Sequence, residues 1–290
     1  MSTIRLMTHN IWNRDKNSPA WEEKGFDCSA AVRAPSLLRV WRETQPDVIG
    51  CQESSALMAD LLKEGMANEP VDYTLIWGRF TPILYRADKL ELVDSEFFTY
   101  PDYIEGFEGK FNDARSKAYN IGVFRVKEDG KLFMFATTHL WWKRSPSEEM
   151  TEPYPSNCLP HSDEAREYQI ELLTTALERF RAKYNCPAFL VGDLNTGFDS
   201  KAVQSAIAKG FRHAHDIATD FAEEAVGYHY CFPDGFKTFY SDRPWRTAID
   251  HILVIGEEEG SVKRFERYSP DYYYPISDHS PAYVDVEFSN

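Results

Sequence analysis

Short apolar runs alternate with polar clusters along this chain, and six of the clusters stand at one end of a strand-like run. The runs cover residues 4–8, 48–51, 133–137, 189–191, 252–255 and 282–288. The clusters are Thr8-His9-Asn10, Gln52-Glu53, Thr138-His139, Gly192-Asp193-Leu194-Asn195, Ile249-Asp250-His251 and Ser277-Asp278-His279. Loops at sheet ends build sites on rigid supports, so the pattern predicts that folding gathers these clusters at one edge.

The remaining periodicity predicts several helices among hairpin-linked strands. Helices are expected over residues 30–43, from Ser54 or Ser55 to about Lys63, over 162–184 and from near Ser200, with further strands over 73–77, 83–85, 90–98, 119–126 and 132–138. A Glu128-Asp129-Gly130 turn indicates a hairpin. We therefore expect an α/β (α+β) sandwich of two packed mixed, largely antiparallel β-sheets with helices on the outer faces, formed by residues 1–290 as a single domain.

The clearest helix begins at Ser162, whose hydroxyl is expected to cap it. Its apolar stripe runs through Ile170, Leu173, Leu177, Phe180 and Tyr184. Arg166 falls on the same inward face. A buried guanidinium needs an anion, so Arg166 either pairs with a core carboxylate or anchors the site loops and the substrate.

If the six clusters converge, four carboxylates share one small volume: Glu53, Asp193, Asp250 and Asp278. Carboxylates at close quarters cannot all stay ionised without raised pKa values or a cation. A hard divalent ion with oxygen ligands, Mg²⁺ or Mn²⁺, is the simplest resolution.

Composition narrows the classes of function. The formal charge of −14 disfavours a nucleic-acid binder, because such proteins depend on basic contacts to phosphate. No apolar stretch approaches the roughly 18 residues of a transmembrane helix, and the N-terminus lacks the features of a secretion signal, so we expect a cytoplasmic protein. The spacing of the five cysteines indicates neither a disulfide framework nor a set of metal ligands. No obligate protein partner is indicated.

The ordered clusters resemble the endonuclease/exonuclease/phosphatase superfamily, which includes pancreatic deoxyribonucleases, abasic-site endonucleases, inositol polyphosphate phosphatases, neutral sphingomyelinases and deadenylases. The resemblance covers roughly residues 4–286. It implies that Glu53, Asp278 and Asn10 bind metal and phosphate. It also implies that His139, in the Thr-His-Leu motif, contacts phosphate.

The same resemblance implies roles for the later clusters. Asp193 and Asn195, in the Gly-Asp-Leu-Asn motif, match the pair that orients the attacking water and the scissile phosphate. Asp250 matches the aspartate that hydrogen-bonds the last histidine, His279. Relatives often hold the phosphate-contacting histidine with an acidic residue in the segment that corresponds to 77–80, where this chain has Arg79.

Several further residues are candidates for substrate binding. Arg115 is assigned to the basic or tyrosine position that contacts phosphate in the family. Lys143 and Arg246 lie in loops near the polar clusters and are expected to receive a phosphate. Trp141 and Trp142 follow His139 and offer stacking surfaces. Together with Arg166, these residues lie in or beside the loops where specificity is expected.

These observations favour a Mg²⁺- or Mn²⁺-dependent hydrolase that splits a phosphomonoester or phosphodiester of a small soluble substrate. A metal-held phosphate would be attacked by a water that Asp193 orients or deprotonates, while His279, kept cationic by Asp250, would stabilise the phosphate charge. A nuclease or deadenylase is the alternative within the enzyme class. An inactive module that recognises a phosphorylated partner is the alternative outside it.

Overall fold

The strands form two facing six-stranded sheets within the part of the chain that the computed structural model describes, which is residues 2–23, 25–71, 73–221, 229–230, 238–239, 248–257, 261–268, 270–273 and 276–288. The first sheet has the order β13 (Val262–Arg267), β14 (Ala282–Glu287), β1 (Thr3–Asn10), β2 (Val48–Gln52), β4 (Ile83–Arg86), β3 (Tyr73–Ile76). The second has the order β5 (Leu90–Thr99), β6 (Ala118–Val126), β7 (Leu132–His139), β8 (Ala188–Asp193), β12 (Asp250–Ile255), β9 (Arg212–His213). A separate short pair joins β10 (His229–Tyr230) to β11 (Thr238–Phe239).

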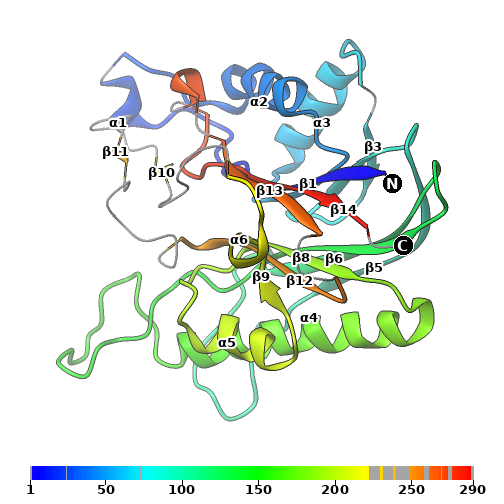
Figure 1. Cartoon of the computed structure of the whole chain (residues 1–290). Helices are drawn as coiled ribbons and strands as arrows, with labels where there is room; N and C mark the ends of the chain where they lie inside the picture. Colours follow the sequence, from blue (N-terminus) through cyan, green and yellow to red (C-terminus); the bar gives the residue numbers. More distant parts are fainter. Residues whose placement is uncertain are drawn as a thin grey trace.

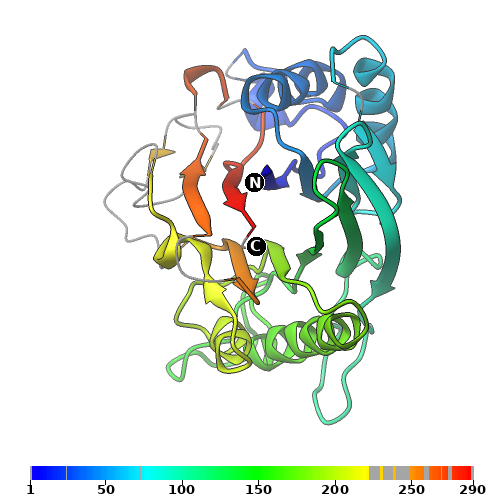
Figure 2. The ribbon, with the colours of Figure 1, turned by 45° about the vertical axis from the view of Figure 1, so that its right-hand side comes forward.

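Helices cover the outer faces of both sheets, as Figures 1 and 2 show. Helices α2 (Ala30–Thr44) and α3 (Ala56–Met66) lie on the first sheet, and α4 (Ser162–Tyr184) and α5 (Lys201–Ala208) lie on the second. Shorter elements are α1 (Pro19–Glu22), α6 (Ala214–Ile217) and the 3₁₀ turn η2 (Asp271–Tyr273). The predicted α/β sandwich is confirmed. No helix among the described residues is long and apolar enough to cross a membrane.

Alternation along the strands divides the apolar side chains between three layers. On β7, Phe133 and Phe135 point into the core between the sheets, whereas Met134 and Ala136 point outward to α4. Successive side chains of a strand point to opposite faces of its sheet, and here both faces of the sheet are buried. Each fully buried large apolar side chain contributes about 1.5–3 kcal/mol relative to exposure.

Two parallel strand pairs determine where the polar clusters meet. Strand β1 pairs in parallel with β2, and β7 pairs in parallel with β8, so the carboxyl ends of each pair lie side by side. The sheets approach each other closely below these ends, because a Cβ added at Gly50 would lie 2.6 Å from the Cβ of Thr137. Strands β12 and β14 run antiparallel to β8 and β1, so their first residues reach the same edge.

Most predicted elements appear within a few residues of their expected ends, but one cap differs. Ser55 and Ser200 accept hydrogen bonds from the first turns of α3 and α5. Ser162 does not cap α4: His161 takes the N-cap position with φ 62°, and the Ser162 hydroxyl donates to Leu159 O at 2.7 Å. The hydroxyl also accepts from Trp141 Nε1 at 3.1 Å, so it serves the loop rather than the helix.

Candidate active site

Asp193 occupies the centre of the polar edge, at the end of β8. Its Oδ1 accepts a hydrogen bond from the backbone N–H of Asn195 at 2.8 Å, and its Oδ2 accepts from Asn10 Nδ2 at 3.0 Å. The side chain is buried, and this desolvation raises the pKa of Asp193 although the nearby His279 opposes the shift. A buried carboxylate with a raised pKa, fixed by two donors, is suited to take up a proton.

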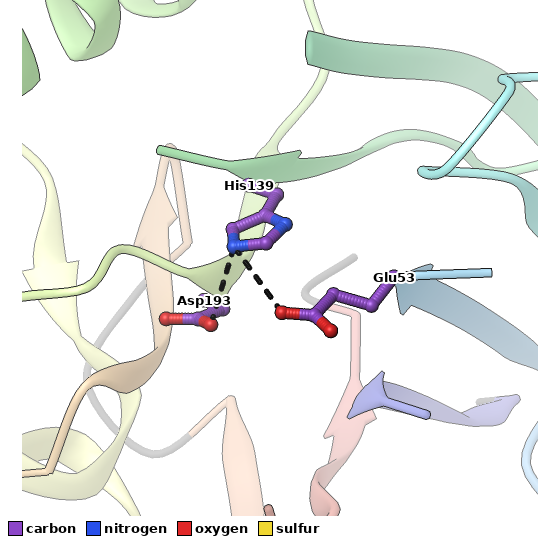
Figure 3. Close-up of side chains that lie close together, drawn as sticks. All are labelled: Glu53, His139 and Asp193. Atoms are coloured by element: carbon purple, nitrogen blue, oxygen red, sulfur yellow. Dashed lines mark ion pairs between the residues drawn. The ribbon is translucent and has the colours of Figure 1, made fainter. Parts of the chain in front are cut away.

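Two histidines face the same oxygen of Asp193 from opposite sheets. His139, at the end of β7, places Nε2 3.5 Å from Asp193 Oδ2, as Figure 3 shows. His279, which precedes β14, places Nε2 3.8 Å from that oxygen. A position between them is therefore bordered by a proton acceptor and two imidazoles.

His279 is held as a cation by its neighbours. Its Nδ1 lies 2.7 Å from Asp250 Oδ2. Burial opposes the charge, but Asp250 and Asp193 outweigh it and keep the pKa of His279 well above its ordinary value. The Tyr273 hydroxyl donates to the His279 carbonyl at 2.5 Å and lies 2.8 Å from His9 Nε2, so the core orients this loop.

His139 has the opposite charge preference. Burial, together with the positive charge of Lys117, holds the pKa of His139 well below its usual value. Lys117 Nζ lies 2.6 Å from His139 Nε2, and burial lowers the pKa of Lys117 to about 8. Among the described residues nothing hydrogen-bonds His139 Nδ1, so no side chain takes the place of the family's acidic partner. Arg79 lies exposed at φ 53° in the neighbouring loop.

Glu53 and Asp278 supply oxygen ligands that suit a divalent cation. Both border the same cavity, and the Glu53 charge acts with burial to raise the pKa of Asp278. Asp278 Oδ1 is buried and has no hydrogen-bond partner in the described part of the chain. Glu53 Oε1 lies 3.8 Å from His139 Nε2, and the donor atoms of Glu53, His139 and Asp193 lie within 4.8 Å of one another. An unsatisfied buried carboxylate oxygen beside further carboxylates fits a hard cation.

Asn10 was predicted to bind the metal, and in the structure its side chain hydrogen-bonds Asp193 and the backbone of Trp12. Its Nδ2 faces Asp193, and its Oδ1 accepts from the backbone N–H of Trp12 at 3.0 Å. Asn10 therefore orients Asp193 in this structure. Its role as a metal ligand stays a prediction.

A buried guanidinium that the sequence did not single out joins the loop that follows Asn10 to the loop that contains Asp278. Arg33, on α2, is 2% exposed. It donates to Ile11 O at 2.7 Å and Ile276 O at 2.8 Å, and also to the carbonyls of Trp12, Arg14 and Cys28. Five carbonyl bonds satisfy the cation without a carboxylate, so Arg33 fixes these loops beside the candidate metal ligands.

A cavity of about 490 Å³ opens at this edge, within the range of small-molecule sites. The carboxylates and histidines that line it are those of Glu53, Asp113, Asp193, Asp278, His139 and His279. Lys117 and Trp142 line it as well. Lys117 was missed because a lysine before an apolar strand is ordinarily a solvated charge. Its only signal in the sequence is its place at the start of the strand that pairs with the one ending in His139.

The structure corrects part of the predicted substrate-binding set. Trp141 is 1% exposed and packs inside, so the structure contradicts a contact with substrate; Trp142 lines the cavity instead. Arg115 is exposed on a turn at φ 58° and does not border the cavity, where Lys117 is the neighbouring cation. Lys143 also lies outside the lining, with Nζ 5.5 Å from the centre of the Trp142 ring. Arg246 falls outside the described residues.

Arg166 was expected either to pair with a core carboxylate or to anchor the site loops and the substrate. It is buried, donates from Nη1 to Trp141 O at 3.1 Å and to Lys143 O at 2.5 Å, and pairs with Asp163. The partner carboxylate is a partly exposed residue of the same helix rather than a core group. Arg166 therefore anchors a site loop.

Two facing mixed sheets gather carboxylates, histidines and a lysine at one edge, an arrangement that suits the hydrolysis of a phosphoester. The family model described as "Endonuclease/Exonuclease/phosphatase family" matches residues 7–279. The chain therefore belongs to this family, whose members are metal-dependent phosphoester hydrolases, and the predicted resemblance is confirmed.

Solved structures that are similar to this chain differ in their names and in what is bound to them. The mannosyl-6-phosphatase Bt3783 of Bacteroides thetaiotaomicron is 20% identical, with 98% of this chain and 100% of that chain covered and a TM-score of 0.71. TDP2 of D. rerio, complexed with a single-strand DNA product, is 16% identical, with 99% and 100% covered and a TM-score of 0.65. The human Nocturnin catalytic domain with bound sulfate is 16% identical, with 99% and 94% covered and a TM-score of 0.60. No curated protein matches the sequence.

Proposed function

We propose that this protein is a Mg²⁺- or Mn²⁺-dependent phosphatase that hydrolyses a small organic phosphate. The observation that carries the proposal is the convergence of His139, His279 and Lys117 around Asp193 in one cavity of about 490 Å³. The chain's charge of −14 and the fold shared with a mannosyl-6-phosphatase support a small substrate. The single domain over residues 1–290 and the cytoplasmic location stay predictions.

The residues divide the chemistry of hydrolysis between them. Asp193 accepts a proton from the water whose oxygen attacks phosphorus, while Asn10 and Asn195 keep its carboxylate in place. The ester P–O bond breaks, the alcohol oxygen takes up a proton from solvent, and Asp193 returns its proton to solvent. Lys117 and the His279 cation balance the charge that develops on the phosphate oxygens. Glu53 and Asp278 would hold a divalent cation, which would supply further positive charge there.

Phosphate release from a panel of compounds tests this function. The panel contains sugar phosphates, inositol phosphates, nucleotides and phospholipid head groups, each assayed with Mg²⁺ or Mn²⁺. EDTA is expected to lower the rate at least about 100-fold, and added metal to restore it. Calorimetry with Mn²⁺ should show binding that Glu53→Ala removes. If no compound releases phosphate in a metal-dependent way, the proposed function is wrong, and metal binding without turnover would favour an inactive module.

Lys117→Met is expected to lower kcat/KM about 10- to 100-fold, because a charged hydrogen bond to phosphate contributes about 1.5–3 kcal/mol. Arg115→Met is the matched control, since Arg115 is an exposed cation two residues away. It should leave kcat/KM within about 2-fold of the wild type. Equal losses in both variants would show that general positive charge matters, rather than the buried ammonium beside His139.

A nuclease or deadenylase is the second candidate function. The exposed Trp142 ring beside His139 favours it, because aromatic rings in such positions stack on bases. Labelled oligonucleotides cleaved by the wild type, but not by Asp193→Ala, would promote this function over the first.

A further inference from the structure

Trp142 presents a large aromatic face to the cavity. It is 43% exposed, whereas the adjacent Trp141 is 1% exposed. The Trp142 indole Nε1–H donates to Asp113 Oδ2 at 2.8 Å, which fixes the rotation of the ring. Lys143 Nζ lies 5.5 Å from the ring centre, and the part of the ring that stays exposed is arranged as a contact surface.

The backbone on both sides of Trp142 is also fixed. The carbonyls of Trp141 and Lys143, which flank it, both accept from Arg166 Nη1. Arg166 is itself buried on α4. The ring therefore stands on a rigid support, and little conformational entropy remains to be lost when a ligand binds.

A second side chain of α4 ties this loop to the one that carries Asp113. Gln169 is fully buried; its Oε1 accepts from Trp141 N–H at 2.8 Å, and its Nε2 donates to Phe111 O at 3.0 Å. The side-chain amide of Gln169 therefore joins residues 111 and 141, which lie near Asp113 and Trp142 in the sequence. The spacing between Asp113 and Trp142 is thus set by the fold.

The pair offers two different contacts to one ligand. The Trp142 ring offers an apolar face, and Asp113 keeps its Oδ1 for a hydroxyl donor once Oδ2 has taken the indole N–H. A cyclic sugar has both an apolar C–H face and hydroxyl groups. The Asp113 charge would repel a second phosphate, which disfavours bisphosphates and polynucleotides.

We propose that Trp142 and Asp113 form the subsite that selects a cyclic sugar as the leaving group, so that the preferred substrate is a sugar monophosphate. This rests on the proposed phosphatase function. The pair lines the same cavity as Lys117, the proposed phosphate contact, and the Asp113 charge acts on Lys117. A sugar ring one or two bonds from the ester oxygen reaches it, and in a nucleoside 5′-phosphate this ring is the ribose, so the base lies beyond the pair.

Steady-state kinetics on two matched substrates tests the subsite. A hexose 6-phosphate supplies the ring, and the corresponding hexitol 6-phosphate supplies the same stereocentres at carbons 2 to 5 on an open chain, with one additional hydroxyl at carbon 5. Trp142→Ala is expected to raise KM for the hexose phosphate about 10-fold or more, and for the hexitol phosphate less than about 3-fold, with kcat little changed. Trp142→Phe should recover most of the affinity. The control is Trp77→Ala, which removes a 63% exposed tryptophan outside the cavity and should change neither KM.

Binding measurements separate the failure of this inference from the failure of the proposed function. Hexose 6-phosphate is titrated with Mg²⁺ present into Asp193→Asn and into Asp193→Asn with Trp142→Ala, and the second should bind about 10-fold more weakly. If the wild type hydrolyses no phosphate but this difference is found, the phosphatase function fails and the subsite stands. Equal KM increases for the hexose and hexitol phosphates overturn the subsite. A larger effect of Trp142→Ala on a nucleoside 5′-monophosphate than on the hexose phosphate also overturns it.

Discussion

Asp193→Asn is expected to lower kcat about 1,000-fold or more while KM stays within about 3-fold, because the amide cannot accept the proton of the attacking water. The substitution keeps the size of the side chain and an oxygen that can accept from Asn195 N–H. Phosphate release under saturating substrate and metal measures the loss. Asp60→Asn, on α3 and outside the cavity, is the control and should keep full activity. Retention of more than about a tenth of the wild-type kcat would remove Asp193 from the role of base.

Relative to the wild type, the same variant should be more stable at pH 8 than at pH 5. The folded-state pKa of Asp193 is raised by burial, so the folded protein binds this proton more tightly than the unfolded chain does. The resulting stability is present below the unfolded pKa and is lost as the pH rises through the folded pKa. In EDTA, the urea midpoint of the variant minus that of the wild type should therefore be more positive at pH 8 than at pH 5, because the lost hydrogen bond from Asn10 costs the same at both pH values. A variant that is inactive and clearly less stable would indicate a damaged site.

Much of the site could be predicted because the apolar pattern of the sequence shows where the strands end. Asn10, His139 and Asp193 end buried runs, and the parallel pairs β1 with β2 and β7 with β8 bring those ends together. The apolar pattern alone determined which residues lie in strands. The gathering of the clusters then follows from sheet pairing.

The loops could not be predicted to the same precision. After His139 the chain leaves the strand, so the alternation that would separate Trp141 from Trp142 no longer applies. The choice between Arg115 and Lys117 depends on a turn in which Ala114 and Arg115 both have positive φ. Such conformations are uncommon for residues other than glycine, and the sequence gives no signal for them.

Arg33 shows a second reason why part of the site is hidden. Its five acceptors are backbone carbonyls from three separate segments of the chain. Every residue has a backbone carbonyl, so no sequence motif shows which residues will accept hydrogen bonds from this cation. The pairing becomes visible only when the loops after Asn10 and before Asp278 are seen around the guanidinium.

Asp250→Asn is expected to lower kcat about 100-fold at pH 8 and to shift the alkaline limb of the pH profile to lower pH. Asp250 Oδ2 lies 2.7 Å from His279 Nδ1, and its charge is the largest influence that raises the pKa of His279 against burial. An amide oxygen can still accept the Nδ1–H hydrogen bond but carries no charge. The geometry is therefore kept while the electrostatic support is removed.

The sign of the shift follows from which form of His279 is active. The imidazolium exists below its pKa, so a lower pKa causes the active form to disappear at a lower pH. In the wild type the high pKa should keep His279 charged through neutral and mildly alkaline pH. The variant should approach wild-type rates as the pH falls, until protonation of Asp193 limits both proteins. His279→Gln, which cannot titrate, should be slow at every pH. A parallel loss in Asp250→Asn at all pH values would mean that Asp250 only positions the ring, because a charge effect must vary with the protonation of His279.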